Sequence, residues 1–130
     1  MMNPNQISAQ ELAYFGDAVV ELLTREHLLS LGIGGVGKLN REAMKYVKAT
    51  AQSAALENIL PLLTEDELAA FKRGRNNHVS AIPKSATAVE YRRATGFEAL
   101  FAYLWLSGNE SRARELFSIA YSHLNEKTST

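Results

Sequence analysis

The sequence predicts an all-α protein, and three features lead to this prediction. Apolar residues recur at the three- and four-residue spacing of amphipathic helices over most of the 130 residues. Capping residues precede several of these segments, and Gly or Pro follows them. No stretch carries the apolar–polar alternation of a half-buried strand. We therefore expect one domain of about five or more helices over residues 1–130, with flexible ends at 1–7 and 126–130.

The first predicted helix covers residues 9–31. Ser8 is a suitable N-cap, and Glu11 three residues later completes a capping box. Apolar residues at helical spacing form a stripe along this helix. The glycine-rich segment 32–37 ends it and is a flexible turn, because no Lys-Ser/Thr pair follows the glycines as in a phosphate-binding loop.

The remaining helices are predicted from similar boundary signals. Pro61 ends the second helix, Thr64 caps the third, and Gly74 ends the third. Gly108 lies in a turn between the last two helices. An irregular exposed loop separates the third helix from the fourth. The predicted bounds are 38–60, 65–73, 87–107 and 111–125 for these helices and 75–88 for the loop.

Composition restricts the setting of the protein. The chain has no cysteine, which excludes disulfides, a thiolate nucleophile and thiolate metal ligands. No apolar run approaches the roughly 20 residues of a membrane span, and the N-terminus lacks the pattern of a signal peptide. We therefore expect a cytoplasmic protein without membrane contact.

The charges balance overall but not locally. The 14 basic residues equal the 14 acidic ones, so net charge gives no sign of a polyanionic partner. The segment 72–93, however, is basic, and His78 lies within it. A solvated loop is the simplest interpretation, and local binding of a polyanion is the alternative. Its charged residues are Lys72, Arg73, Arg75, Lys84, Arg92 and Arg93, against one acid, Glu90.

Two predicted helices each carry one carboxylate in an otherwise apolar segment. Asp17 is the only charge within residues 12–20, and Glu98 is the only charge within 94–106. A buried carboxylate is costly unless something neutralises it. Two carboxylates that meet repel each other unless a cation lies between them, and this cation can be an arginine or a metal ion.

Both kinds of cation give a testable hypothesis. A metal ion at this place would have oxygen ligands, which favours Mg²⁺, or Mn²⁺ in its place, and suits hydrolysis of a phosphodiester. In the alternative, the carboxylates pair with Arg92 or Arg93 in an interaction module that catalyses nothing. Glu21, one turn after Asp17, either joins the metal site or pairs with Arg25.

Two motifs resemble the catalytic domain of ribonuclease III. Residues 14–21, Tyr-Phe-Gly-Asp-Ala-Val-Val-Glu, are similar to the signature helix of that family, and residues 95–100, Thr-Gly-Phe-Glu-Ala-Leu, are similar to its second motif. The resemblance covers residues 9–125 and is closest to the subgroup Mini-ribonuclease III, in which the catalytic domain stands alone. Further marks of that subgroup are Lys72-Arg-Gly-Arg-Asn76, Pro83-Lys84 and Tyr91-Arg92.

The resemblance implies an all-α homodimer that cuts both strands of double-stranded RNA with Mg²⁺ and leaves 5′-phosphate ends. For the Mini subgroup, the implied substrate is precursor 23S ribosomal RNA. Asp17 and Glu98 match the catalytic, metal-binding carboxylates, and Glu21 is a further candidate ligand. We expect the first helix to form part of the dimer surface. The hypothesised RNA contacts are Lys72, Arg73, Arg75, His78, Lys84 and Arg92.

The chain departs from the larger ribonucleases III at two positions. Ala13 and Thr95 stand where those enzymes carry further acidic residues, so two of four expected carboxylates are missing. We also expect no double-stranded-RNA-binding domain of the kind that follows the catalytic domain there. These departures motivate a second hypothesis, a non-catalytic ribonuclease III-like dimer that binds RNA or a ribosomal assembly. Retention of both Asp17 and Glu98 favours the enzyme.

Overall fold

The computed structural model describes residues 2–77 and 84–124, and every regular element within them is helical. This confirms the predicted all-α class. Over these residues the chain forms six α-helices and two short 3₁₀ helices. In chain order they are η1 (Pro4–Gln6), α1 (Ala9–Ser30), α2 (Val36–Val47), α3 (Ala49–Glu57), η2 (Leu60–Leu62), α4 (Glu65–Arg75), α5 (Ala88–Leu106) and α6 (Glu110–Ala120).

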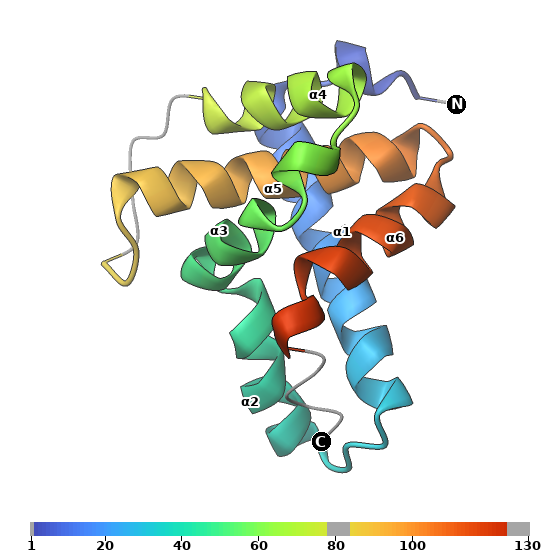
Figure 1. Ribbon diagram of the computed structural model, residues 1–130, viewed down its shortest axis with the longest axis vertical. Coiled ribbons are helices and arrows are strands. Elements are labelled where there is room, and N and C mark those ends of the chain that lie inside the picture. The colour runs from blue at the N-terminus through green and yellow to red at the C-terminus, as the bar shows by residue number, and fades with distance from the viewer. Residues whose placement is uncertain (1, 78–83, 125–130) are drawn as a thin grey trace.

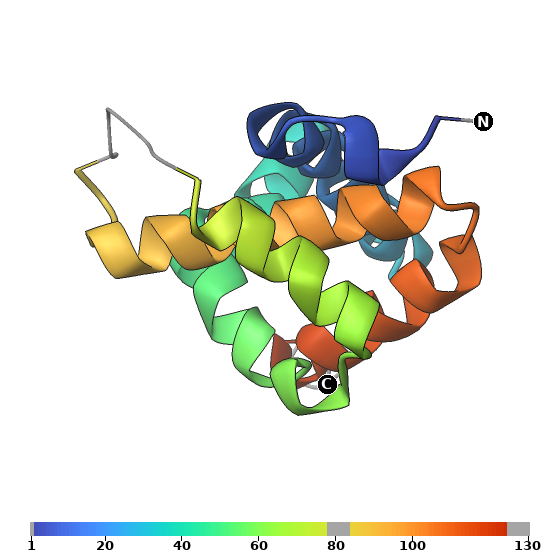
Figure 2. The same ribbon diagram turned by 90° about the horizontal axis from the view of Figure 1, so that it is seen from above.

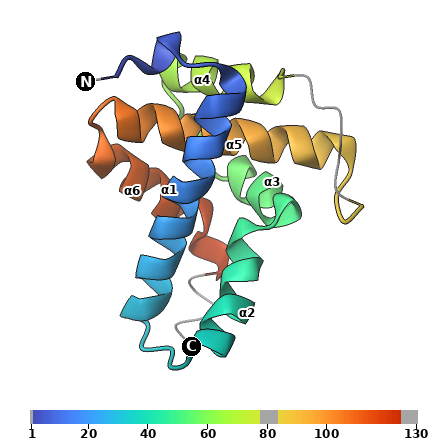
Figure 3. The ribbon, with the colours of Figure 1, turned by 180° about the vertical axis from the view of Figure 1, so that it is seen from behind.

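Helix α5 is the centre of the architecture, because it packs against α1, α3, α4 and α6. Helix α1 crosses behind α5 in Figure 1 and in front of it in Figure 3. Seen from above, α4 and α1 lie on opposite sides of α5 (Figure 2). Helix α2 packs beside the second half of α1 (Figure 1). None of the helices in the described part of the chain is long and apolar enough to span a membrane.

The helix starts predicted after Ser8 and Thr64 are confirmed by their caps, whereas α2 begins at Val36 rather than at residue 38. The Ser8 hydroxyl accepts from the backbone N–H of Glu11 at 3.1 Å, and the Glu11 carboxylate accepts from the backbone N–H of Ser8. Thr64 and Glu67 form the same reciprocal pair at the start of α4. Each capping box satisfies two N–H groups that have no partner within the helix.

The prediction of one helix over residues 38–60 is wrong, because the chain is extended at Lys48 and begins a new helix there. No Pro or Gly marks this break. Two side chains instead bind the last carbonyls of α2. The Tyr121 hydroxyl donates to the Tyr46 carbonyl at 2.7 Å, and the Gln52 amide donates to the Val47 carbonyl at 3.1 Å. Distant and local side chains therefore satisfy groups that a continuous helix would pair internally.

Gly74 does not end α4 as predicted, since the helix continues to Arg75. Gly74 is buried against α5, and a Cβ there would lie 2.7 Å from the Cβ of Ala99. On α5, a Cβ at Gly96 would lie 2.6 Å from the ring of Phe71. These glycines are therefore needed for the close approach of α4 and α5 rather than for a helix stop.

The two ends of the chain also differ from the expectation. In the leader, Pro4 is buried, and the Arg73 guanidinium donates to the carbonyls of Pro4 and Ile7 at 3.3 and 2.5 Å. The segment 3–7 therefore has fixed contacts with α4 rather than the loose form expected for residues 1–7. At the other end, α6 ends at Ala120, and a turn at Tyr121 separates it from the helical residues 122–124, so the helix predicted over 111–125 is interrupted. Residues 126–130 lie outside the described part of the chain.

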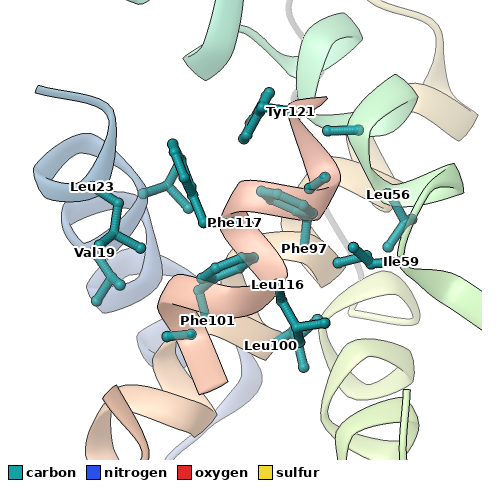
Figure 4. Packing of buried hydrophobic residues seen from close by; sticks show 14 of the residues in the cluster. Val19, Leu23, Leu56, Ile59, Phe97, Leu100, Phe101, Leu116, Phe117 and Tyr121 are labelled. Atoms are coloured by element: carbon teal, nitrogen blue, oxygen red, sulfur yellow. The ribbon is translucent and has the colours of Figure 1, made fainter. Parts of the chain in front are cut away.

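Aromatic side chains of α5 and α6 form the middle of the core (Figure 4). The rings of Phe97 and Phe101 lie 4.8 Å apart between centroids, and Phe117 and Tyr121 lie at the same separation. Val19 and Leu23 of α1 face these rings. This cluster fixes α6 against the crossing of α1 and α5. The remaining labelled members are Leu56, Ile59, Leu100 and Leu116 (Figure 4).

Candidate active site

The two carboxylate-bearing helices cross at a glycine. Gly16 of α1 is buried against α5, and a Cβ at this position would lie 1.7 Å from the backbone oxygen of Glu98. No side chain fits in that space, so the two backbones touch. Because Asp17 follows Gly16 directly, the crossing places the carboxyl groups of Asp17 and Glu98 side by side.

The surroundings of Glu98 raise the proton affinity of its carboxylate. Burial, followed by the charge of Asp17, raises the pKa of Glu98 to about 8. A hydrogen bond between the two carboxyl groups acts in the same direction because it requires a proton. The Gln52 amide donates to Oε2 of Glu98 at 3.4 Å and partly opposes these effects. Within the pair, Glu98 therefore keeps its proton up to near neutral pH.

Arginine does not neutralise this pair. Arg93 pairs with Glu57 at 2.5 Å and so points to α3 rather than to the carboxylates. Arg92 lines a smaller pocket to which neither carboxylate contributes. Within residues 2–77 and 84–124, neither Asp17 nor Glu98 forms an ion pair. The hypothesis that Arg92 or Arg93 neutralises them is therefore wrong for the isolated chain.

An open pocket of about 450 Å³ surrounds the carboxylates. Helices α1, α3 and α5 and the end of α2 form its walls, and Tyr14 at its edge is 84% exposed. Its volume accommodates a hydrated ion together with a phosphate group. The lining residues are Gln10, Ala13, Tyr14, Asp17, Val47, Ala49, Gln52, Asn77, Tyr91, Ala94, Thr95 and Glu98.

The sequence patterns did not identify three polar members of this pocket, Gln10, Gln52 and Asn77. Gln52 is 1% exposed and occupies the core side of α3, beside Ala55 and Leu56. A lone glutamine at core spacing among apolar residues was the signal that could have identified it. Asn77 had no comparable signal, because it lies in the irregular segment after α4.

The acidic cluster contains two residues rather than three. Glu21 does not line the pocket, and its carboxylate pairs with Arg25 at 3.2 Å, which selects the second of the two alternatives for Glu21. Ala13 and Thr95 do line the pocket, at the positions where larger relatives are acidic. In the described residues, no group of three or more His, Cys, Asp or Glu side chains could hold a metal ion.

The basic residues of segment 72–93 differ from one another in their surroundings. The Arg73 guanidinium is engaged with the leader, which gives this residue a structural role instead of a free charge. Arg75 and Arg92 line a pocket of about 250 Å³ together with Asn77, which also lines the carboxylate pocket. The two pockets are therefore neighbours. Lys72 and Lys84 are exposed, and His78 lies outside the described residues.

Comparison with known proteins identifies the family. The model of the ribonuclease III domain matches residues 10–109, a range that contains both carboxylates. The chain belongs to the ribonuclease III family. Its similarity to the Mini-ribonuclease 3 of Symbiobacterium thermophilum is 45% identity over 120 residues, which is 92% of each chain. The Mini-ribonuclease 3 of Enterococcus faecalis is 38% identical over 97% of each chain.

A solved structure shares this fold. The crystal structure of a Fusobacterium nucleatum protein superposes with a TM-score of 0.84 at 29% sequence identity. The match covers 95% of this chain and 98% of the other. The resemblance to Mini-ribonuclease III stated from the motifs is therefore confirmed over nearly the whole length, and the protein is an endoribonuclease of the ribonuclease III family.

Proposed function

We propose that this ribonuclease III-family endoribonuclease hydrolyses duplex RNA at Asp17 and Glu98 with a bound Mg²⁺ ion. The observation that carries the proposal is the uncompensated carboxylate pair in an open pocket. Structural acids are normally buried with a cationic partner, whereas a pair of acids without one suits a cation supplied from solution. Mn²⁺ is expected to substitute for Mg²⁺.

The residues present fit a hydrated magnesium ion. Two carboxylates supply hard oxygen ligands, and magnesium commonly keeps several water molecules, so a pocket with two acids is sufficient. Gln52 leaves one buried amide oxygen without a partner among the described residues, which adds a polar acceptor near the pair. When bound, the ion would lower the pKa of its water and stabilise charge on the scissile phosphate.

The chain itself would position the RNA backbone. Arg75 and Arg92 line a pocket that shares Asn77 with the carboxylate pocket, so phosphates held there would continue toward Asp17 and Glu98. Exposed Lys72 and Lys84 extend this basic surface. Arg73 is left out of the proposed contacts because its guanidinium binds the leader. Such backbone contacts recognise duplex shape rather than base sequence.

A homodimer is part of the proposal, and the outer face of α1 supports it. Tyr14, Ala18, Leu22 and Leu29 are exposed there at spacings that keep them on one side of the helix. A second copy that covers this face would bring two carboxylate pockets to one RNA duplex, as cutting both strands requires. Sedimentation velocity of the full chain is the check, and a monomer at micromolar concentration would contradict it.

The proposed substrate is structured ribosomal RNA, namely precursor 23S RNA, and the products carry 5′-phosphates. This follows from the similarity to Mini-ribonuclease 3 proteins and extends beyond their names. The binding-only dimer remains the second candidate, because Ala13 and Thr95 leave the pocket with two acids.

A cleavage assay tests the proposal. Long duplex RNA and precursor 23S RNA are incubated with the wild type and with Asp17→Asn, each with Mg²⁺ and with EDTA. We expect cutting by the wild type with Mg²⁺ alone, and none by Asp17→Asn. The control Asp66→Asn alters an exposed acid on α4 and should cut normally. Failure of the folded wild type to cut either RNA, with binding retained, would select the binding-only dimer.

A further inference from the structure

Gln52 connects the break between α2 and α3 to the carboxylate pair. Its Nε2 donates to the backbone carbonyl of Val47 at 3.1 Å and to Oε2 of Glu98 at 3.4 Å. The side chain is 1% exposed, yet the residue lines the open pocket that contains Asp17. One buried amide thus contacts the end of one helix and the inner carboxylate of another.

The orientation of this amide is fixed by its partners. The Val47 carbonyl can only accept a hydrogen bond, so it selects the NH₂ group of Gln52 rather than the oxygen. The Oε1 atom is then left buried without a hydrogen-bond partner in the described part of the chain. Buried acceptors in proteins nearly always have a partner, so a lone one beside two carboxylates points to a group supplied from outside the chain.

A purely structural role explains Gln52 poorly. Its neighbours on the same side of α3 are Ala55 and Leu56, both fully buried. The bond to the Val47 carbonyl uses only the Nε2 end of the amide and gives no reason for a buried Oε1 without a partner in the described residues. The break at Lys48 makes the amide reach Glu98, because it turns the start of α3 toward the pocket.

We propose that Gln52 is a positioning residue for the metal site. Its Nε2 holds the Glu98 carboxylate in place, and its Oε1 accepts a hydrogen bond from water on a divalent cation held by Asp17 and Glu98. This inference rests on the proposed function, because it requires that cation. Groups that orient metal ligands in this way typically change metal affinity about 10- to 100-fold when removed.

Direct Mn²⁺ binding tests the inference without the cleavage reaction. Free Mn²⁺ is followed by electron paramagnetic resonance during titration of the wild type and of Gln52→Met, whose flexible side chain fills a similar volume. We expect Gln52→Met to bind Mn²⁺ at least about tenfold more weakly. The matched control is Asn58→Leu, which removes another amide-to-carbonyl bond, from Asn58 Nδ2 to the Ala120 oxygen at 2.9 Å, and should leave Mn²⁺ affinity unchanged.

The possible outcomes separate this inference from the proposed function. Equal Mn²⁺ affinity of the wild type and Gln52→Met would overturn the role of Gln52 and leave the metal site standing. Absence of Mn²⁺ binding by the wild type would overturn the metal site itself.

A second variant keeps the test decisive if Gln52→Met does not fold. Gln52→Glu adds a third acid beside Glu98, so Mn²⁺ should raise its melting temperature by more than it raises that of the wild type. A shift no larger than the wild-type shift would show that this side chain does not face the cation.

Discussion

Buried Glu67 and half-buried Glu98 are two acids that the same fold treats in opposite ways. Glu67 of α4 is 4% exposed, and Arg112 of α6 donates to both of its carboxylate oxygens at 2.9 Å. The hydrogen bonds from Arg112 lower the pKa of Glu67. Glu98 of α5 instead faces Asp17, and burial together with that charge raises its pKa to about 8.

The difference in cationic partners indicates different roles for Glu67 and Glu98. The Glu67–Arg112 pair fastens α4 to α6, and Arg112 also donates to the Leu62 carbonyl, so every charge there has a partner. The fold is therefore able to provide an arginine where a carboxylate is buried. At Glu98 it provides a second acid and an open pocket, an arrangement that lowers stability unless a cation enters.

Substitutions of the two acids should differ most in their effect on the rate of RNA cleavage. Glu98→Gln removes one proposed metal ligand, and we expect the rate of RNA cleavage to fall by about 10³-fold or more, equivalent to about 4 kcal/mol. The free energy of unfolding without metal should stay the same or rise, because repulsion with Asp17 is relieved. Single-turnover cleavage and urea unfolding measure both. A variant that cuts RNA at the wild-type rate would contradict the role of Glu98.

Glu67→Gln should show the converse behaviour. It leaves the Arg112 charge without its main partner and weakens the cap at Thr64, so we expect the free energy of unfolding to fall by about 3 kcal/mol. Once folded, the variant should bind Mn²⁺ as the wild type does. Urea unfolding gives the first quantity and the Mn²⁺ titration gives the second. Weaker Mn²⁺ binding by the folded variant would show that the two regions are coupled.

Cations that flank the carboxylate pocket should act on RNA affinity rather than on stability. Replacing both Arg75 and Arg92 with Gln should weaken duplex binding about tenfold and reduce the slope of log K against log salt by about 2, one for each lost phosphate contact. The control Arg114→Gln alters an arginine that pairs with Glu26 and Glu110. The measurement is duplex affinity at several salt concentrations. Equal slopes for the wild type and the double variant would refute these contacts.

The pH dependence of stability should have opposite signs at the two acids. The lowered pKa of Glu67 means that its contribution is present above pH 4.5 and is lost as the pH falls through the folded-state pKa. The raised pKa of Glu98 means that its contribution is present below pH 4.5 and is lost as the pH rises toward 8.

Unfolding in EDTA measures this contrast. The stability of the wild type relative to Glu67→Gln should fall as the pH falls below 4.5, whereas the stability of the wild type relative to Glu98→Gln should fall as the pH rises from 4.5 toward 8. Two differences that change in the same direction would contradict the assignment of one neutralised and one uncompensated acid.

Local signals were sufficient for the all-α class, for the capped helix starts and for the two acids, because those signals depend on nearby residues. The capping boxes at Ser8 and Thr64 lie within four residues, and the apolar surroundings of Asp17 and Glu98 are visible in the sequence itself. The family motifs added the expectation that Asp17 and Glu98 act together, and the structure places them together.

What the sequence could not supply depends on contacts between distant segments. The break at Lys48 needs Tyr121, and the continuation of α4 through Gly74 needs the small surface of α5. In the sequence Arg73 is one of several cations of a basic segment, and only the folded structure shows that its guanidinium binds the leader. Gln52 belongs to the pocket only because that break turns α3 toward Glu98. In each case tertiary packing overrides the local pattern.

The contact between Gly16 and the backbone of Glu98 also has a consequence for biosynthesis. Asp17 leaves the ribosome long before Glu98, and neither alone forms the carboxylate pair. The pair exists only after α5 has been synthesised and has docked on α1, with no gap for a side chain between them. A nascent or partly unfolded chain is therefore expected to be inert toward the RNA around it, and nuclease activity begins with the completed fold.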